Sequence, residues 1–183
     1  YDMTPEEQAA KYRRNFTLLE KQAGLDPDNP YLYYQLGKTC EILEDFSRAC
    51  TYYDKGLTFD LDPELAYVQA MVVSYGNALL HTGQSETALG FEGIYGEFSS
   101  VTDFVYLMGN IYKNNGMFEQ ALEQYQKALQ MPDGRQSGAN SFLPLYQCGE
   151  IFERIGDTES ARALYAQCGD FLPAMQRLAA LRP

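Results

Sequence analysis

Four segments of this chain align with one another, and the alignment brings small residues into fixed columns. The segments begin at Leu36, Tyr75, Met108 and Cys148. Glycine interrupts helices at a cost of about 1 kcal/mol relative to alanine, so its recurrence in register indicates close packing between helices. Each segment has a glycine at its second position and an alanine twelve residues later: Gly37, Gly76, Gly109 and Gly149, then Ala49, Ala88, Ala121 and Ala161.

Bulky residues and turn signals complete each unit. Three residues after each glycine stand Cys40, Leu79, Tyr112 and Phe152. A tyrosine follows three of the four alanines by four residues, and Glu92 interrupts that column; the tyrosines are Tyr53, Tyr125 and Tyr165. Further glycines follow seven residues after three of the repeat glycines, where a first helix must end, and Glu44 with Asp45 takes their place in the first unit. Each unit is therefore predicted to be a helix–turn–helix.

These columns resemble the tetratricopeptide repeat (TPR), a helical hairpin of about 34 residues. The third unit matches best, with Met108, Gly109, Tyr112, Gly116, Phe118, Ala121, Tyr125, Ala128 and Pro132. The resemblance implies an all-α fold: a right-handed α-solenoid of about four TPR hairpins with capping helices at both ends. We expect one domain over 1–183, with repeats at 30–62, 69–100, 102–132 and 142–170 between caps at about 1–28 and 171–183.

The start of the first cap carries its own signal. Thr4 supplies an N-cap hydroxyl, Pro5 stands at the first helical position and Glu7 at the third. With Gly24 able to close the far end, the sequence predicts a helix over about 5–23. Only one loop-like stretch of appreciable length is expected, at residues 132–141, and flexibility is expected to concentrate there.

Charge and cysteine content exclude several classes of function. A net charge of −11 has the wrong sign for nucleic acid or an anionic membrane surface, so neither is expected as a partner. The opening residues lack a secretory pattern, and a chain beginning at Tyr1 is interpreted as an excised fragment. Four cysteines without a Cys-x-x-Cys pair favour reduced thiols, so we expect a cytoplasmic protein.

No group of residues in the sequence has the spacing of a catalytic site or of a metal-binding site. The single histidine, His81, has no partner tied to it by sequence, and the cysteines are interpreted as core residues. Asp26 with Asp28, and Asp60 with Asp62, are Asp-x-Asp matches in loops between helices, where no nucleotide-binding strand precedes them. We therefore predict no catalytic residue, no metal site and no cofactor, and this chain is not expected to be an enzyme.

Binding is instead expected on the first helix of each unit, which lines the concave face of a solenoid. Three tyrosines at one column, Tyr34, Tyr106 and Tyr146, could hold an extended peptide or could simply fill the core, and both interpretations stay open. Mixed charges farther along these helices favour a hydrogen-bonded peptide over a strongly ionic ligand. The residues predicted to face the groove are Tyr34, Lys38, Val73, Asn77, Tyr106, Asn110, Tyr146 and Glu150.

The two ends of the chain carry a narrower resemblance. Residues 14–21 with 26–31, and residues 171–181, resemble the TPR region that follows the catalytic domain of bacterial family 2 glycosyltransferases. The resemblance implies a non-catalytic interaction or self-association module of such an enzyme, binding a peptide, an acceptor protein, its parent catalytic domain or a second copy. Two alternatives remain: recognition of an acceptor glycan by Tyr34, Tyr106 and Tyr146, and a free-standing adaptor.

Overall fold

The computed structural model describes residues 4–181, and within them the regular structure is helical throughout. This confirms the predicted all-α fold. The described residues form two compact units, one ending at Ala88 and the other beginning at Leu89. Residues 1–3 and 182–183, which belong to the predicted caps at 1–28 and 171–183, lie outside the described residues.

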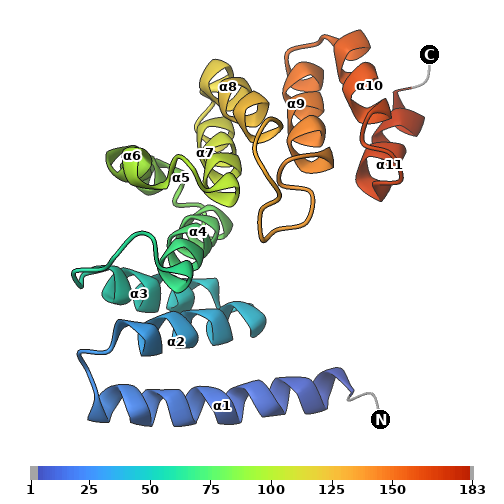
Figure 1. Ribbon diagram of the computed structural model, residues 1–183. Helices are drawn as coiled ribbons and strands as arrows, with labels where there is room; N and C mark the ends of the chain where they lie inside the picture. The colour runs from blue at the N-terminus through green and yellow to red at the C-terminus, as the bar shows by residue number, and fades with distance from the viewer. Residues whose placement is uncertain (1–3, 182–183) are drawn as a thin grey trace. The chain divides into compact units, whose positions relative to one another are not determined.

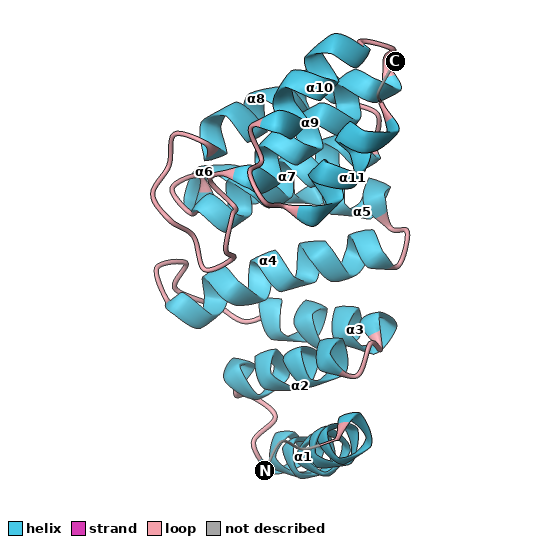
Figure 2. Cartoon of the chain, turned by 90° about the vertical axis from the view of Figure 1, so that its right-hand side faces the viewer, coloured by secondary structure: helices cyan, strands magenta, loops and turns pink. Residues whose placement is uncertain are grey.

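The first unit is a succession of antiparallel helices. In Figures 1 and 2, α1 to α4 follow one another in layers, and each helix packs on the next. Thr4 and Glu7 form the predicted capping box, with the Glu7 amide donating to Thr4 Oγ1 at 3.2 Å. The helix continues through Gly24 and ends at Leu25 instead of residue 23. The elements are α1 (Pro5–Leu25), α2 (Pro30–Ile42), α3 (Phe46–Leu57), α4 (Ala66–His81) and α5 (Ser85–Ala88).

The second unit contains two complete hairpins and a closing helix. It begins with the 3₁₀ helix η1 (Leu89–Ile94) and the short α6 (Tyr95–Phe98). The hairpins are α7 (Thr102–Asn114) with α8 (Phe118–Ala128), and α9 (Phe142–Arg154) with α10 (Thr158–Ala166). The final helix, α11 (Leu172–Ala180), packs on α10 (Figure 1).

A tyrosine ring lying on a glycine holds each complete hairpin together. The rings of Tyr53, Tyr125 and Tyr165 cover Gly37, Gly109 and Gly149, and a Cβ at any of these glycines would come within 3.0 Å of the ring. All three tyrosines are fully buried, and so are the repeat alanines Ala49, Ala88, Ala121 and Ala161. The alanine and glycine columns are therefore buried. The first helix requires glycine because the aromatic ring occupies the space that a side chain would fill.

The hairpin predicted at 69–100 is not complete, which corrects the expectation of a helix–turn–helix in every unit. Its second helix is divided into α5, η1 and α6. Gly90, Gly93 and Gly96 lie in this stretch, and nothing lies within 4 Å of where their Cβ atoms would be. These glycines weaken the helix without serving any close contact. Glu92 stands where the other units have the tyrosine, so this unit lacks the residue that forms the ring contact elsewhere.

The loop at 132–141 is fixed to the start of α7. Asp103 is buried, and its carboxylate accepts hydrogen bonds from the backbone amides of Arg135 and Gln136 at 2.8 and 3.1 Å. The Thr102 hydroxyl donates to the Pro132 carbonyl at 2.8 Å. These hydrogen bonds anchor the first residues of the insertion to α7, and the expected flexibility of the loop stays a prediction.

Among the described residues, no helix is both long enough and apolar enough to cross a membrane.

Gly109→Ala should destabilise the protein because its new methyl group would overlap the Tyr125 ring. Overpacking of this kind costs about 1–3 kcal/mol, measurable as a lower denaturation midpoint in urea. Gly96→Ala is the matched control, since its Cβ meets open space and alanine favours the helix, so its midpoint should stay the same or rise. Equal losses for both variants would contradict the ring contact.

Candidate binding faces of the first helices

The predicted groove residues lie on the first helix of each hairpin, as their column implied. Those in the first unit lie on α2 and α4, and those in the second unit lie on α7 and α9. We call these two surfaces the α2/α4 face and the α7/α9 face. Their members are Tyr34, Lys38, Val73 and Asn77 on the former, and Tyr106, Asn110, Tyr146 and Glu150 on the latter.

A cluster of three tyrosines occupies the α2/α4 face. Tyr31 and Tyr34 of α2 lie with ring centroids 5.8 Å apart, and the Tyr67 ring of α4 lies 5.3 Å from Tyr31 and 6.0 Å from Tyr34. Tyr31 is 46% exposed and the other two are half-buried. We call these residues the tyrosine cluster. The sequence prediction included only Tyr34, although the spacing of three residues within one helix could have pointed to Tyr31.

The rest of the α2/α4 face combines one ion pair with unpaired groups. Lys38 Nζ lies 2.6 Å from the Glu41 carboxylate one turn along α2. Val73 and Asn77 are half-buried on α4. The Tyr34 hydroxyl and the Asn77 carboxamide have no side-chain hydrogen bond to any residue within 4–181. This face therefore keeps polar groups that its own fold does not use.

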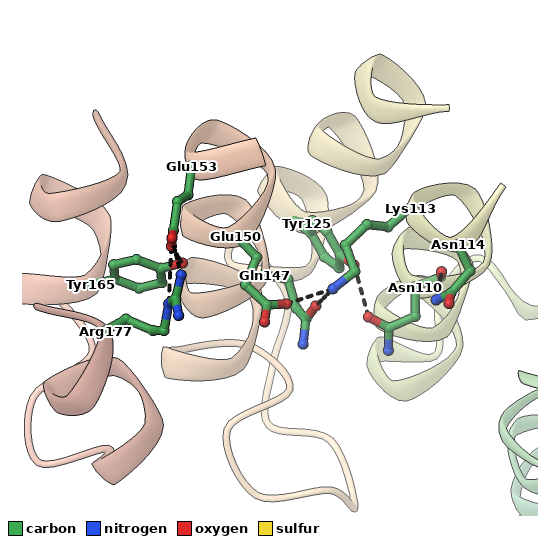
Figure 3. A network of polar contacts seen from close by, with 9 residues as sticks. All are labelled: Asn110, Lys113, Asn114, Tyr125, Gln147, Glu150, Glu153, Tyr165 and Arg177. Atoms are coloured by element: carbon green, nitrogen blue, oxygen red, sulfur yellow. Dashed lines mark hydrogen bonds and ion pairs between the residues drawn. The ribbon is translucent and has the colours of Figure 1, made fainter. Parts of the chain in front are cut away.

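On the α7/α9 face, by contrast, the polar groups are paired. Figure 3 shows Lys113 reaching from α7 to Gln147 and Glu150 on α9, and its Nζ lies 2.6 Å from the Glu150 carboxylate. The pair is partly buried, with the Lys113 side chain 22% exposed. Its position ties one first helix to the next.

The Glu153 carboxylate likewise joins helices, in this case α9 with α10 and α11. Glu153 of α9 accepts a hydrogen bond from the Tyr165 hydroxyl of α10 at 2.9 Å. Arg177 of α11 donates to the same carboxylate through Nε at 3.1 Å and through its terminal nitrogen (Figure 3). The contacts join three helices of the second unit. Neither Lys113 nor Glu153 was assigned this role from sequence, because their partners come from other helices.

The remaining predicted residues of the α7/α9 face are largely taken up by packing. Tyr106 is only 6% exposed and lies against Tyr125, and burial raises the pKa of Tyr106 above its ordinary value. Asn110 accepts a hydrogen bond from the Tyr125 hydroxyl at 2.8 Å. Tyr146 packs between Tyr165 and Phe171, with centroids 5.5 and 5.4 Å away.

Burial determines the protonation state of two interior thiols. Burial raises the pKa of Cys40 to about 11 and that of Cys148 to about 12, so both thiols stay protonated near neutral pH. His81 stacks on Phe46 with ring centroids 4.3 Å apart. Among the described residues, no group of three or more histidine, cysteine or acidic side chains is placed to hold a metal ion.

The repeat tyrosines provide a test of which polar groups are satisfied. Tyr125→Phe should cost about 0.5–1.5 kcal/mol in the free energy of unfolding, because it removes the hydrogen bond to Asn110. Tyr53→Phe should be neutral or stabilising, because the Tyr53 hydroxyl is buried without a hydrogen-bond partner among the described residues. Urea unfolding of both variants measures the difference. An equal or larger loss for Tyr53→Phe would contradict this assignment.

Comparison with protein families agrees with the repeat columns. Models of the tetratricopeptide repeat match residues 30–63 and 103–131. These segments contain the first and third of the four aligned units. No curated protein matches the sequence significantly.

Solved structures resemble the fold along nearly its whole length at low sequence identity. MamA is similar at 17% identity and a TM-score of 0.69, over 98% of this chain and 99% of that one. YrrB, described as a TPR protein with an unusual peptide-binding site, is similar at 18% identity and a TM-score of 0.69, over 93% and 84% of the two chains. Part of the APC/C Cut9–Hcn1 hetero-tetramer is similar at 12% identity and a TM-score of 0.73, over 94% of this chain and 33% of that one. The glycine–tyrosine hairpins, the two matched segments and these folds together establish that the chain contains tetratricopeptide repeats and has the fold of a TPR solenoid.

Proposed function

We propose that this chain is a non-catalytic protein-interaction module that holds a peptide or an extended segment of a partner protein on the α2/α4 face. TPR folds serve as interaction scaffolds, and YrrB is one neighbour whose description names a peptide-binding site. The observation that carries the proposal is the set of polar groups that this face leaves unpaired.

Asn77 is central to the proposed binding. Its carboxamide offers both a donor and an acceptor, which suits the alternating amides and carbonyls of a peptide backbone. It is half-buried and has no hydrogen-bond partner within residues 4–181, so it would be partly desolvated before the ligand arrives. Val73 lies one turn earlier on the same helix and supplies apolar area for a ligand side chain.

Tyr34 contributes a rigid surface on α2. A tyrosine ring provides a large contact area and loses little conformational entropy on binding. Its hydroxyl is also free among the described residues, so it can form a further hydrogen bond with a ligand. The corresponding residue of the second unit, Tyr106, is packed against Tyr125. For this reason we place the proposed site on the first unit.

Selection from a random peptide library, followed by affinity measurement, tests this function. A peptide enriched on the protein should lose at least tenfold in affinity when Asn77 is replaced by alanine, since the ligand backbone would lose its hydrogen-bond partner. Thr51→Ala is the control, because Thr51 is exposed on α3, the second helix of the hairpin, and should leave affinity unchanged. Failure to enrich any peptide, or equal losses in both variants, would argue against the proposed function.

The larger context remains a prediction from the sequence resemblance. We expect the module to belong to a bacterial glycosyltransferase, and the reading frame preceding the codon for Tyr1 tests that expectation directly. Contact with the parent catalytic domain, self-association and a cytoplasmic location are expectations of the same kind.

Glycan recognition is a second candidate, favoured by the exposed Tyr31 ring and the half-buried rings beside it. Because the chain contains no tryptophan, its fluorescence comes from its 15 tyrosines, and comparing the native chain with a Tyr34→Leu variant isolates the response of one ring of the cluster. The same response to millimolar sugars in both proteins would argue against stacking.

A further inference from the structure

We propose that the tyrosine cluster and the two acidic loops beside it select a cationic peptide segment, one that carries arginine or lysine side chains. This inference rests on the proposed function and adds to it the chemical class of the partner. It depends on three observations: the open tyrosine rings, the carboxylates that border them, and the internal pairing of the nearby cations.

The tyrosine cluster presents aromatic surface that the fold does not cover. Tyr31 is 46% exposed, and its ring meets the Tyr67 ring edge to face, with an interplanar angle of 88°. Tyr34 is tilted by 46° and 48° against the other two rings. Aromatic faces are electron-rich and attract guanidinium and ammonium groups. Three rings at different orientations offer such a face in more than one direction.

The loops that lead into the cluster carry carboxylates. Tyr31 is the second residue of α2 and Tyr67 is the second residue of α4, so the preceding loops run directly into the cluster. None of these carboxylates forms an ion pair within the described part of the chain, and all are exposed. They are Asp26 and Asp28 before α2, and Asp60, Asp62 and Glu64 before α4.

Two lysines of α2 and α3 already have partners within the first unit. Lys38 pairs with Glu41 on α2. Lys55 of α3 lies over the rings of Tyr33 and Phe59, with its Nζ 5.9 and 5.5 Å from their centroids. Neither therefore neutralises the loop carboxylates. The charge of the surface is left to be balanced by solvent ions or by a ligand.

The charge of the site separates possible ligands. An arginine side chain can stack on a tyrosine ring while its terminal nitrogens reach a carboxylate, so one residue uses both features of the surface. An acidic or phosphorylated peptide would meet like charges on two sides. A neutral peptide could use the rings and Asn77 but would gain nothing from the loops. The combination of rings and carboxylates therefore favours a cationic segment.

Two probes test the inference on the whole chain: a fluorescein-labelled hexa-arginine peptide and a hexa-glutamate peptide of the same design. We expect fluorescence polarisation to show binding of the first only, weakening as salt is added. The double variant Tyr31→Leu with Tyr34→Leu keeps apolar bulk but removes the rings, and should weaken hexa-arginine binding at least tenfold. Circular dichroism of that variant checks that it is folded.

Two triple variants with the same change in net charge distinguish binding at the proposed site from attraction of the cationic peptide to the net negative charge of the protein. The triple variant Asp60→Asn, Asp62→Asn and Glu64→Gln should weaken hexa-arginine binding at least fivefold. Glu119→Gln, Glu123→Gln and Glu159→Gln change the net charge equally with exposed residues of the second unit, and should change affinity less than twofold. Equal losses in the two triple variants would overturn the inference.

The peptide library described above distinguishes failure of this inference from failure of the proposed function. Enriched peptides should carry an excess of arginine and lysine. Enrichment of neutral or acidic peptides that still depend on Asn77 would refute cationic selection and leave the interaction function standing. Enrichment of no peptide, together with no binding of hexa-arginine, would refute both.

Discussion

The contact between a tyrosine ring and a glycine backbone is the interaction on which the repeated structure depends. The ring comes from the second helix of a hairpin and fills the space left by the missing side chain on the first helix. This arrangement buries a large aromatic side chain completely and brings the two backbones close together. The contact also directs the phenolic hydroxyl to the first helix, where Asn110 accepts it in one hairpin and Glu153 in another. The same contact thus fixes the hairpin and helps to determine which polar groups remain on the binding face.

The divergent hairpin departs from this pattern in sequence and in structure. Glu92 replaces the tyrosine, and glycines at 90, 93 and 96 occupy open positions. The second helix divides into short α and 3₁₀ segments, and the boundary between the two compact units falls between the first two of them, at Ala88 and Leu89. Ala88 itself stays fully buried, so the alanine column alone does not sustain a helix.

The hairpins could be predicted from sequence because their determinants lie within one short segment. The glycine and tyrosine columns, represented by Gly109 and Tyr125, recur at a fixed spacing in three units, and that spacing corresponds to the contact of the ring with the glycine. The state of the binding face could not be predicted in this way. Asn77 and Glu150 occupy the same column, yet Glu150 pairs with Lys113 of another first helix and Asn77 has no such partner among the described residues. Tyr67 joins the tyrosine cluster because the loop before α4 positions that helix. That loop lies outside the aligned columns, so the alignment could not predict the contact.

The difference between the two faces follows from how repeats share their surface groups. A polar residue on a first helix either joins that helix to the next or remains free for a ligand, and it cannot do both fully. On the α7/α9 face the pair between Lys113 and Glu150 is partly shielded, with side chains 22% and 36% exposed, so a ligand there would have to replace its contacts. On the α2/α4 face, Asn77 has no hydrogen bond and the loop carboxylates form no ion pair among the described residues. Binding to the first unit therefore gives up fewer internal contacts, while the corresponding groups of the second unit serve to hold its helices together.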